Sequence, residues 1–281
     1  MGTMNNAEFS TIIGMVSLLA GFLGALTGLG GGVVIVPLLT LAFGVDIRYA
    51  VGASLVSVIA TSSGAAAAYV REGFSNIRIG MFLEIATTIG AVCGAFLATR
   101  MPTAAIAIIF GIVLMYSSAM SFRKHEGPAP GLAPDPMATA LHLHGEYPVE
   151  GEMRPYHVRR VPLGFGIMFG AGALSGMLGI GSGAVKVLAM DEAMQVPFKV
   201  STTTSNFMIG VTAAASAGVY LSRGYIDPSL AMPVTLGVLA GSLLGARFLV
   251  RAKTHAVRII FAVVIAFLAL EMVYNGLAGK L

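Results

Sequence analysis

Two glycine-rich stretches, Gly28-Leu29-Gly30-Gly31-Gly32 and Gly179-Ile180-Gly181-Ser182-Gly183, interrupt the hydrophobic segments of this chain. Each follows an apolar segment long enough to span a bilayer and precedes a shorter one. Glycine in a helix interior costs about 1 kcal/mol relative to alanine, so several together favour a break in the helix. Unwound backbone at membrane depth is tolerated only inside protein or along a polar cavity. Two breaks at corresponding places therefore predict a transporter's binding site. The alternative is that the glycines only allow close helix packing.

The composition indicates an integral membrane protein. Of the 281 residues, 56% are hydrophobic and 11% are charged, and the mean hydropathy is +0.86. Soluble domains are about 25% charged. The net charge of +4 comes from scattered Lys and Arg, without the basic clusters typical of nucleic-acid binding, so we expect no nucleic-acid partner. The single cysteine, Cys93, excludes an intramolecular disulfide and a site made of several cysteines.

The apolar segments predict the membrane helices. Glu8 is the only charge before the first segment, whereas a signal peptide begins with positive charge, so we expect this segment to be retained. A spanning helix needs about 20 mostly apolar residues. In order, the sequence predicts segments at Phe9–Thr27, Val33–Gly44, Arg48–Val70, Ile79–Thr99, Thr103–Phe122, Pro162–Leu178, Ala184–Met194, Val200–Leu221, Ser229–Val250 and Ala256–Asn275. The two that follow the glycine stretches are too short to span comfortably and fit half-helices or re-entrant segments.

The two halves of the chain repeat each other at a fixed offset. Gly21 and Gly172 lie 151 positions apart (172 − 21). The same offset pairs residues along a whole half without a gap, among them Gly28/Gly179, Gly30/Gly181, Gly32/Gly183, Ser54/Ser205, Tyr69/Tyr220, Gly90/Gly241 and Arg100/Arg251. Such self-similarity predicts structural repeats. We place one repeat at residues 1–122, a linker at 123–160 and the second repeat at 161–281.

The distribution of Lys and Arg favours inverted repeats. Cytoplasmic loops carry an excess of these residues, and the linker holds several of them, so we place it in the cytoplasm. Five crossings per half would invert the repeats and keep most remaining Lys and Arg inside. Four crossings would make them parallel and move Lys199 and the basic residues of 247–258 outside. The predicted fold is an all-α polytopic membrane protein of the cell inner membrane. It has two inverted repeats of about five helical elements each, with glycine-broken or re-entrant helices.

The linker is the one polar stretch of the chain. Its prolines and polar residues favour a loosely ordered loop. His142-Leu143-His144 is a pattern that can bind a metal, but no carboxylate or cysteine set accompanies it. We therefore interpret it as a solvated linker and expect neither a metal nor another cofactor.

Lys186 is the charged residue that stands out in the second half. It lies three residues after Gly183, at the start of the short segment, and its repeat counterpart is Ile35. A charge near the bilayer centre costs about 2.5–3.5 kcal/mol on insertion scales, so it is a functional candidate by default. Next to a helix N-terminus, an ammonium group would bind an anion. The alternative is that Lys186 reaches the interface or pairs with Asp191 or Glu192.

Polar residues follow each short segment at equivalent positions. Ser54, Ser205 and Asn206 could donate hydrogen bonds to an oxyanion, although hydroxyls in membrane helices often bond their own backbone. Glu84 lies in an otherwise apolar segment. A buried carboxylate can titrate, which makes Glu84 a candidate proton carrier, and the alternative is a solvated position near the interface.

Three motifs of the chain resemble the sulfite exporter TauE/SafE family of membrane permeases. They are the first glycine stretch followed by Val36-Pro37, the second followed by Val185-Lys186-Val187, and Thr204-Ser205-Asn206-Phe207-Met208-Ile209-Gly210. The resemblance covers nearly the whole chain apart from the linker. It implies ion-coupled transport of sulfur-containing anions such as sulfite, sulfoacetate and other organosulfonates, without choosing among them.

The sequence thus predicts a secondary transporter that exports a small sulfur-containing anion by alternating access. The predicted binding residues are Gly30, Gly31, Gly32, Ser54, Gly181, Ser182, Gly183, Lys186, Ser205 and Asn206. The partners are the anion and the lipid bilayer, and a homo-oligomer is compatible with the sequence. An anion channel or uniporter is the alternative. An enzyme acting within the membrane ranks below both, because the sequence shows no catalytic motif.

Overall fold

The computed structural model describes residues 6–27, 31–71, 75–120, 135–149, 152–249 and 254–280. The helices of the first half are α1 (Asn6–Thr27), α2 (Gly32–Phe43), α3 (Ile47–Arg71), α4 (Ile77–Ala98) and α5 (Thr103–Met120). Those of the second half are α7 (Val161–Leu178), α8 (Gly183–Leu188), the π-helical η1 (Ala189–Ala193), α9 (Phe198–Ser222), α10 (Pro228–Leu249) and α11 (Thr254–Leu277). They coincide closely with the predicted apolar segments, which confirms the all-α polytopic membrane fold.

Length and composition single out three helices as able to cross a membrane. Within the described part of the chain these are α4, α7 and residues Pro228–Gly245 of α10. The same part of the chain also contains shorter apolar helices, namely α2 and parts of α1, α3, α5 and α11. These three helices of full length, α4, α7 and the start of α10, therefore have the length that a bilayer demands.

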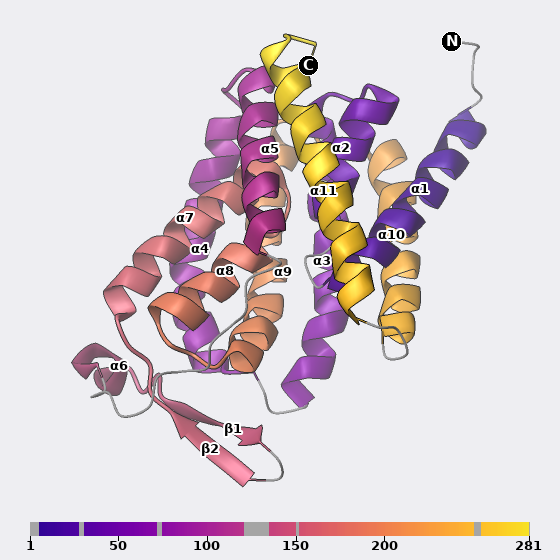
Figure 1. Cartoon of the computed structure of the whole chain (residues 1–281). Helices are drawn as coiled ribbons and strands as arrows, with labels where there is room; N and C mark the ends of the chain where they lie inside the picture. The colour runs from indigo at the N-terminus through magenta and orange to yellow at the C-terminus, as the bar shows by residue number, and fades with distance from the viewer. Residues whose placement is uncertain are drawn as a thin grey trace.

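Each glycine break reverses the direction of the chain. Phe9, near the start of α1, packs edge-to-face on Phe43 at the end of α2, with ring centroids 6.2 Å apart. In the second half, Arg159 before α7 donates its backbone N–H to the carbonyl of Met194 after η1, at 3.0 Å. Thus α1–α2 and α7–α8–η1 are helical hairpins, each with both ends on one side of the molecule (Figure 1).

The two short segments take the re-entrant form that the sequence allowed, which argues against five crossings per half. The 12 residues of α2 make a helix about 18 Å long, whereas the hydrocarbon core is about 30 Å thick. Hence α2 and α8–η1 return from the break instead of crossing.

The packing of the helices follows the internal repeat. Helix α1 packs along α10, and α4 packs along α7. The 151-residue offset relates α1 to α7 and α4 to α10, so the two interfaces are equivalent in the repeat. A Cβ on Gly90 would overlap the carbonyl oxygen of Phe169, and a Cβ on Gly241 would overlap that of Leu18. Gly241 and Phe169 are the repeat counterparts of Gly90 and Leu18. Glycine therefore permits the same close backbone approach at both interfaces.

Helices α3 and α9 pack against each other at the centre, in opposite directions. Tyr49 at the start of α3 contacts Tyr225 just after α9, with ring centroids 5.5 Å apart. Farther along, the place of a Cβ on Gly210 of α9 lies 2.6 Å from Oγ of Ser62 of α3. Corresponding helices thus run antiparallel, as inverted repeats require. The inversion relative to the bilayer stays a prediction.

The prediction of a loosely ordered linker is wrong for residues 135–149 and 152–160. They form α6 (Pro136–Ala140) and a two-stranded antiparallel sheet of β1 (Gly145–Val149) and β2 (Glu152–Tyr156). Pro148 and Pro155 fit because both strands are edge strands. The other linker residues, 123–134 and 150–151, lie outside the described residues.

The sheet is held against the ends of the membrane helices. Leu143, Tyr156 and Val158 are buried in one apolar cluster with residues of α4, α7 and α9. Asn76, which caps α4 through Ile79, donates its side-chain amide to Tyr156 Oη at 2.6 Å and to the carbonyl of Leu143 at 3.3 Å. The division into two repeats and a separate linker stays a prediction, although the linker shares this core.

Candidate functional site

The second glycine break reverses the chain through left-handed backbone. Gly179, Gly181 and Ser182 have φ values of 67°, 71° and 45°. Glycine adopts this region freely, whereas it is uncommon for serine. Ser182 is buried, and its hydroxyl has no hydrogen-bond partner in the described part of the chain. The α7–α8 turn therefore brings a strained, polar stretch of backbone into the protein interior.

The two breaks meet at the centre of the molecule. Of the first break, Gly30 lies outside the described residues, whereas Gly31 and Gly32 begin α2. A Cβ on Gly32 would lie 2.5 Å from Oγ of Ser54 and 2.8 Å from the carbonyl oxygen of Gly179. Only glycine fits there, so the first break, α3 and the second break are in direct contact, as the repeat predicts.

Serine hydroxyls hold the second break in place. Ser54 donates its hydroxyl to the carbonyl of Gly179 at 2.7 Å, and Ser205 donates to the carbonyl of Gly183 at 3.3 Å. Both serines are buried. In this conformation the hydroxyl protons of Ser54 and Ser205 are donated to these two glycine carbonyls. Asn206 is half-buried, and its side chain makes no hydrogen bond to the described part of the chain.

Lys186 is fully buried and forms a hydrogen-bonded chain with two residues. Its Nζ donates to Thr212 Oγ1 at 2.6 Å, and Thr212 Oγ1 lies 2.7 Å from Glu84 Oε1. The three residues come from α8, α9 and α4. Because a buried ammonium needs compensation, Glu84 supplies the opposite charge through Thr212. The Asp191 or Glu192 pairing considered from the sequence is not the bond that Lys186 makes.

Glu84 is buried rather than solvated, with 8% of its surface exposed. Thr88 donates a second hydrogen bond to Oε1 at 3.1 Å. The other oxygen, Oε2, is buried and has no hydrogen-bond partner among the described residues. A carboxylate oxygen without a partner is costly to bury, and a proton bound at Oε2 would remove the negative charge.

Sequence reasoning missed Thr212, although two signals point to it. Thr212 lies seven residues after Ser205, so both occupy one face of α9. The charged pair also breaks the repeat, because Lys186 and Glu84 correspond to Ile35 and Thr235. Two complementary charges that replace uncharged residues of the other half are candidates for contact.

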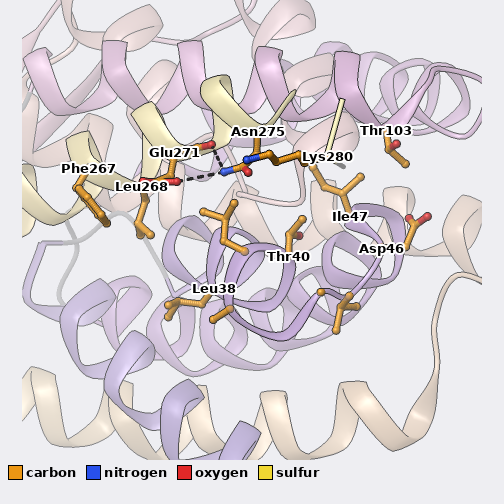
Figure 2. A pocket seen from close by; sticks show the side chains of 14 residues that line it. Leu38, Thr40, Asp46, Ile47, Thr103, Phe267, Leu268, Glu271, Asn275 and Lys280 are labelled. Atoms are coloured by element: carbon orange, nitrogen blue, oxygen red, sulfur yellow. Dashed lines mark hydrogen bonds between the residues drawn. The ribbon is translucent and has the colours of Figure 1, made fainter. Parts of the chain in front are cut away.

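Two cavities lie next to each other beside α2 and α11. One, of about 740 Å³, lies between α2, the start of α3 and the end of α11 and is lined by polar residues that include Thr40, Asp46, Glu271 and Lys280 (Figure 2). The other, of about 510 Å³, is lined by apolar residues of α1, α2 and α11. Neither is lined by Lys186 or Glu84. The central chain of Lys186, Thr212 and Glu84 is therefore closed off from both cavities.

Helical hairpins that meet at the centre and a buried charged pair are features of polytopic membrane transporters. Residues 13–272 match the family described as Sulfite exporter TauE/SafE, and the chain belongs to that family.

Similar curated proteins carry names of the same kind. The chain is 26% identical to "Probable membrane transporter protein YunE" of Bacillus subtilis, over 95% of the chain and 98% of that protein. It is 26% identical to "Probable membrane transporter protein YdhB" of the same species, over 83% and 86%. It is 24% identical to "Probable membrane transporter protein" of Xylella fastidiosa strain 9a5c, over 93% and 94%. No solved structure matches the chain.

Proposed function

We propose that the protein is a secondary transporter that carries a small sulfur-containing anion, such as sulfite, sulfoacetate or another sulfonate, by ion-coupled alternating access. The description of the family supports the substrate class. The observation that carries the proposal is the fully buried Lys186 beside the meeting point of the two breaks. A buried ammonium with a movable partner is a site for an anion.

The charges at the centre suggest how the anion is coupled to an ion. Without substrate, the Lys186 ammonium is balanced by the Glu84 carboxylate through Thr212. An anion at Lys186 would add a negative charge next to that carboxylate, and burying such an excess charge is costly. Protonation of Glu84 at Oε2 restores neutrality. The anion and one proton would therefore bind together and leave together, and their gradients would set the direction, export included.

The glycine breaks would complete the anion site. The backbone N–H groups of Gly31 and Gly32 lie at the start of α2, those of Gly181–Gly183 lie at the start of α8, and helix ends of this kind favour anions. Gly30, which lies outside the described residues, is proposed to contribute its N–H group from the sequence alone. Ser182 offers a hydroxyl without a partner in the described residues. Ser54 and Ser205 would donate to the anion only after release from the carbonyls of Gly179 and Gly183, and Asn206 would reach it with its amide. Movement of the two hairpins against α3 and α9 would then open the site alternately to each side.

The proposal is tested by flux in proteoliposomes. The substrates are sulfite, sulfoacetate, taurine, sulfate and acetate, each with and without a pH gradient. We expect flux of sulfite or a sulfonate that increases with an imposed proton gradient. In Lys186→Gln the flux should fall roughly 10- to 100-fold, the loss expected for a charged hydrogen bond worth about 1.5–3 kcal/mol. Lys199→Gln, an exposed lysine on α9, is the matched control. Normal sulfonate flux in Lys186→Gln would refute the role of Lys186.

An anion channel or uniporter is the alternative function. It would also use a buried lysine and helix ends, but it would not need Glu84 to gain a proton. Ohmic currents, or flux that ignores the pH gradient in both wild type and Glu84→Gln, would favour it. Saturable flux that loses its response to the pH gradient in Glu84→Gln would favour the coupled transporter.

A further inference from the structure

The polar and the apolar cavity are parts of one groove between α2 and α11. Leu38, Phe267 and Leu268 line both cavities. Beyond these shared residues, the apolar cavity continues along α1 and along α11 as far as Val263. The polar cavity continues in the other direction to Asn275 and Lys280. The groove thus has an apolar part of about 510 Å³ and a polar part of about 740 Å³.

The dimensions of the groove match one leaflet of a bilayer. From Val263 to Asn275, α11 rises about 18 Å, and half of the hydrocarbon core is about 15 Å. At the polar end, Lys280 Nζ lies 5.2 Å from the ring centre of Tyr274, and Tyr274 is exposed. Tyr and Lys are typical of the membrane–water interface. The polar cavity therefore lies at headgroup depth, and the apolar cavity lies beside the acyl chains.

The polar cavity holds both signs of charge. Glu271 and Asp46 supply carboxylates, and Lys280 supplies an ammonium group (Figure 2). One oxygen of Glu271 accepts a hydrogen bond from the amide of Asn275 at 3.1 Å. Thr40 is 3% exposed, lines the cavity, and has no hydrogen-bond partner for its hydroxyl in the described part of the chain. A ligand with a phosphate for Lys280 and a hydrogen-bonding ammonium for a carboxylate would pair with both signs of charge.

We propose that this groove binds one phospholipid with an ethanolamine headgroup. One of its two acyl chains fills the apolar cavity. Its phosphate contacts Lys280, and its ammonium donates hydrogen bonds to Glu271. A choline headgroup has a quaternary ammonium without N–H donors, so it cannot make those bonds. The site is separate from Lys186 and Glu84, and it stands whether or not the proposed anion is the substrate.

A tryptophan reporter tests the acyl-chain position. The chain contains no tryptophan, so Phe267→Trp places a single reporter in the wall shared by both cavities. Phe169→Trp, on the exposed face of α7, reports ordinary surrounding lipid. The nanodiscs consist of choline lipid with a minor fraction of brominated lipid. We expect brominated ethanolamine lipid to quench the Phe267→Trp variant more than brominated choline lipid does, and both to quench the Phe169→Trp variant equally. Equal quenching of the Phe267→Trp variant by both headgroups would overturn the proposal.

The headgroup contacts are tested by thermal unfolding in detergent. A lipid at a hundred times its Kd would raise the Tm of wild type by roughly 5 °C. We expect this increase from added ethanolamine lipid and not from choline lipid, and we expect Glu271→Gln and Lys280→Gln to lose it. Asp227→Asn, an exposed acid at the same end of the molecule, should keep it. Stabilisation by a long-chain alkyl sulfonate instead of the lipid would overturn the proposal and assign the groove to an amphiphilic substrate.

Discussion

The hydroxyl of Thr212 joins Lys186 to Glu84, although the two charged residues belong to different halves of the repeat. Its oxygen lies 2.6 Å from the lysine Nζ and 2.7 Å from the glutamate Oε1. The repeat counterparts of Lys186, Glu84 and Thr212 are Ile35, Thr235 and Thr61, so the other half has no such pair. The two breaks are related by the repeat, but the charge that an anion would recognise is supplied by one of them.

A double-mutant cycle will test the dependence of Lys186 on Glu84. Removing one member of a buried ion pair costs about 3–5 kcal/mol, because the other charge is left uncompensated. Lys186→Met and Glu84→Gln should each lower the free energy of unfolding in detergent by an amount of that order. The double variant should recover a large part of the loss, because neither charge remains. Losses that simply add would show that the two residues do not interact.

Thr212 should matter through its hydroxyl rather than its shape. Thr212→Val keeps the size of the side chain but leaves the Lys186 ammonium without its hydrogen-bond acceptor, which costs about 1–3 kcal/mol. We expect lower thermal stability and strongly reduced anion flux in proteoliposomes. Thr212→Ser retains the hydroxyl and should keep most of both. The same pair of changes at Thr61, the repeat counterpart, is the control, and equal losses there would argue against a special role for Thr212.

Much of the fold could be predicted from the sequence because its signals are local. Apolar segments of membrane length and the 151-residue offset indicated the helix order, and the glycine stretches marked both breaks. The return of α2 and α8 could not be decided, because it depends on contacts between distant residues, such as Phe9 with Phe43. The ordered part of the linker was missed because Pro148 and Pro155 lie in edge strands and because its anchor, Asn76, lies outside it.

The candidate site was predicted in part. Lys186 and the breaks follow from charge and glycine content. The bond through Thr212 does not, because three helices bring its partners together. The sequence could not show that the hydroxyls of Ser54 and Ser205 are engaged by glycine carbonyls. It also provided no sign of the cavity beside Thr40, since that cavity is formed by the spacing of α2 and α11.

The close approach of α4 and α7 should make Gly90 intolerant of a side chain. A Cβ there would overlap the backbone carbonyl of Phe169, and overpacking of this kind costs about 1–3 kcal/mol. Gly90→Ala should lower the Tm, and Gly241→Ala at the equivalent α1–α10 contact should do the same. Gly170→Ala, on α7 with open space around its Cβ position, should be neutral or stabilising by about 0.5–1 kcal/mol. A destabilised Gly170→Ala with an unaffected Gly90→Ala would contradict this packing.

Tyr156 should fasten the linker to α4. Its hydroxyl oxygen accepts a hydrogen bond from the amide of Asn76 at 2.6 Å, and burial raises the pKa of this phenol, so it stays neutral at physiological pH. Tyr156→Phe removes the acceptor and should cost about 1 kcal/mol. The loss should appear as faster proteolysis of residues 135–160 and a slightly lower Tm. Tyr147→Phe, whose ring packs on Tyr156, is the control, and an equal effect of both variants would show that the hydroxyl of Tyr156 is not the cause.

Acidic pH should loosen the linker through His144. Its Nδ1 accepts a hydrogen bond from the backbone N–H of Val158 at 3.1 Å, and its Nε2 lies 3.1 Å from Thr139 Oγ1. Desolvation and the neighbouring His157 hold the pKa of His144 below its ordinary value of 6.5, although Asp135 opposes them. The unfolded linker therefore binds a proton more readily than the folded one.

The sign of the effect follows from this difference. Stability from neutral His144 is fully present above its ordinary pKa of 6.5 and is lost as the pH falls below that value toward the lower pKa of the folded state. Protonation also removes the acceptor that Val158 uses. We expect the Val158 amide to exchange hydrogen faster at about pH 5.5 than at about pH 7.5, on either side of the ordinary histidine pKa, after correction for the intrinsic rate. His144→Asn, which keeps an acceptor that does not titrate, should flatten this dependence, whereas His142→Gln at an exposed position should not. An unchanged pH profile in His144→Asn would assign the dependence to another group, with His157 the nearest.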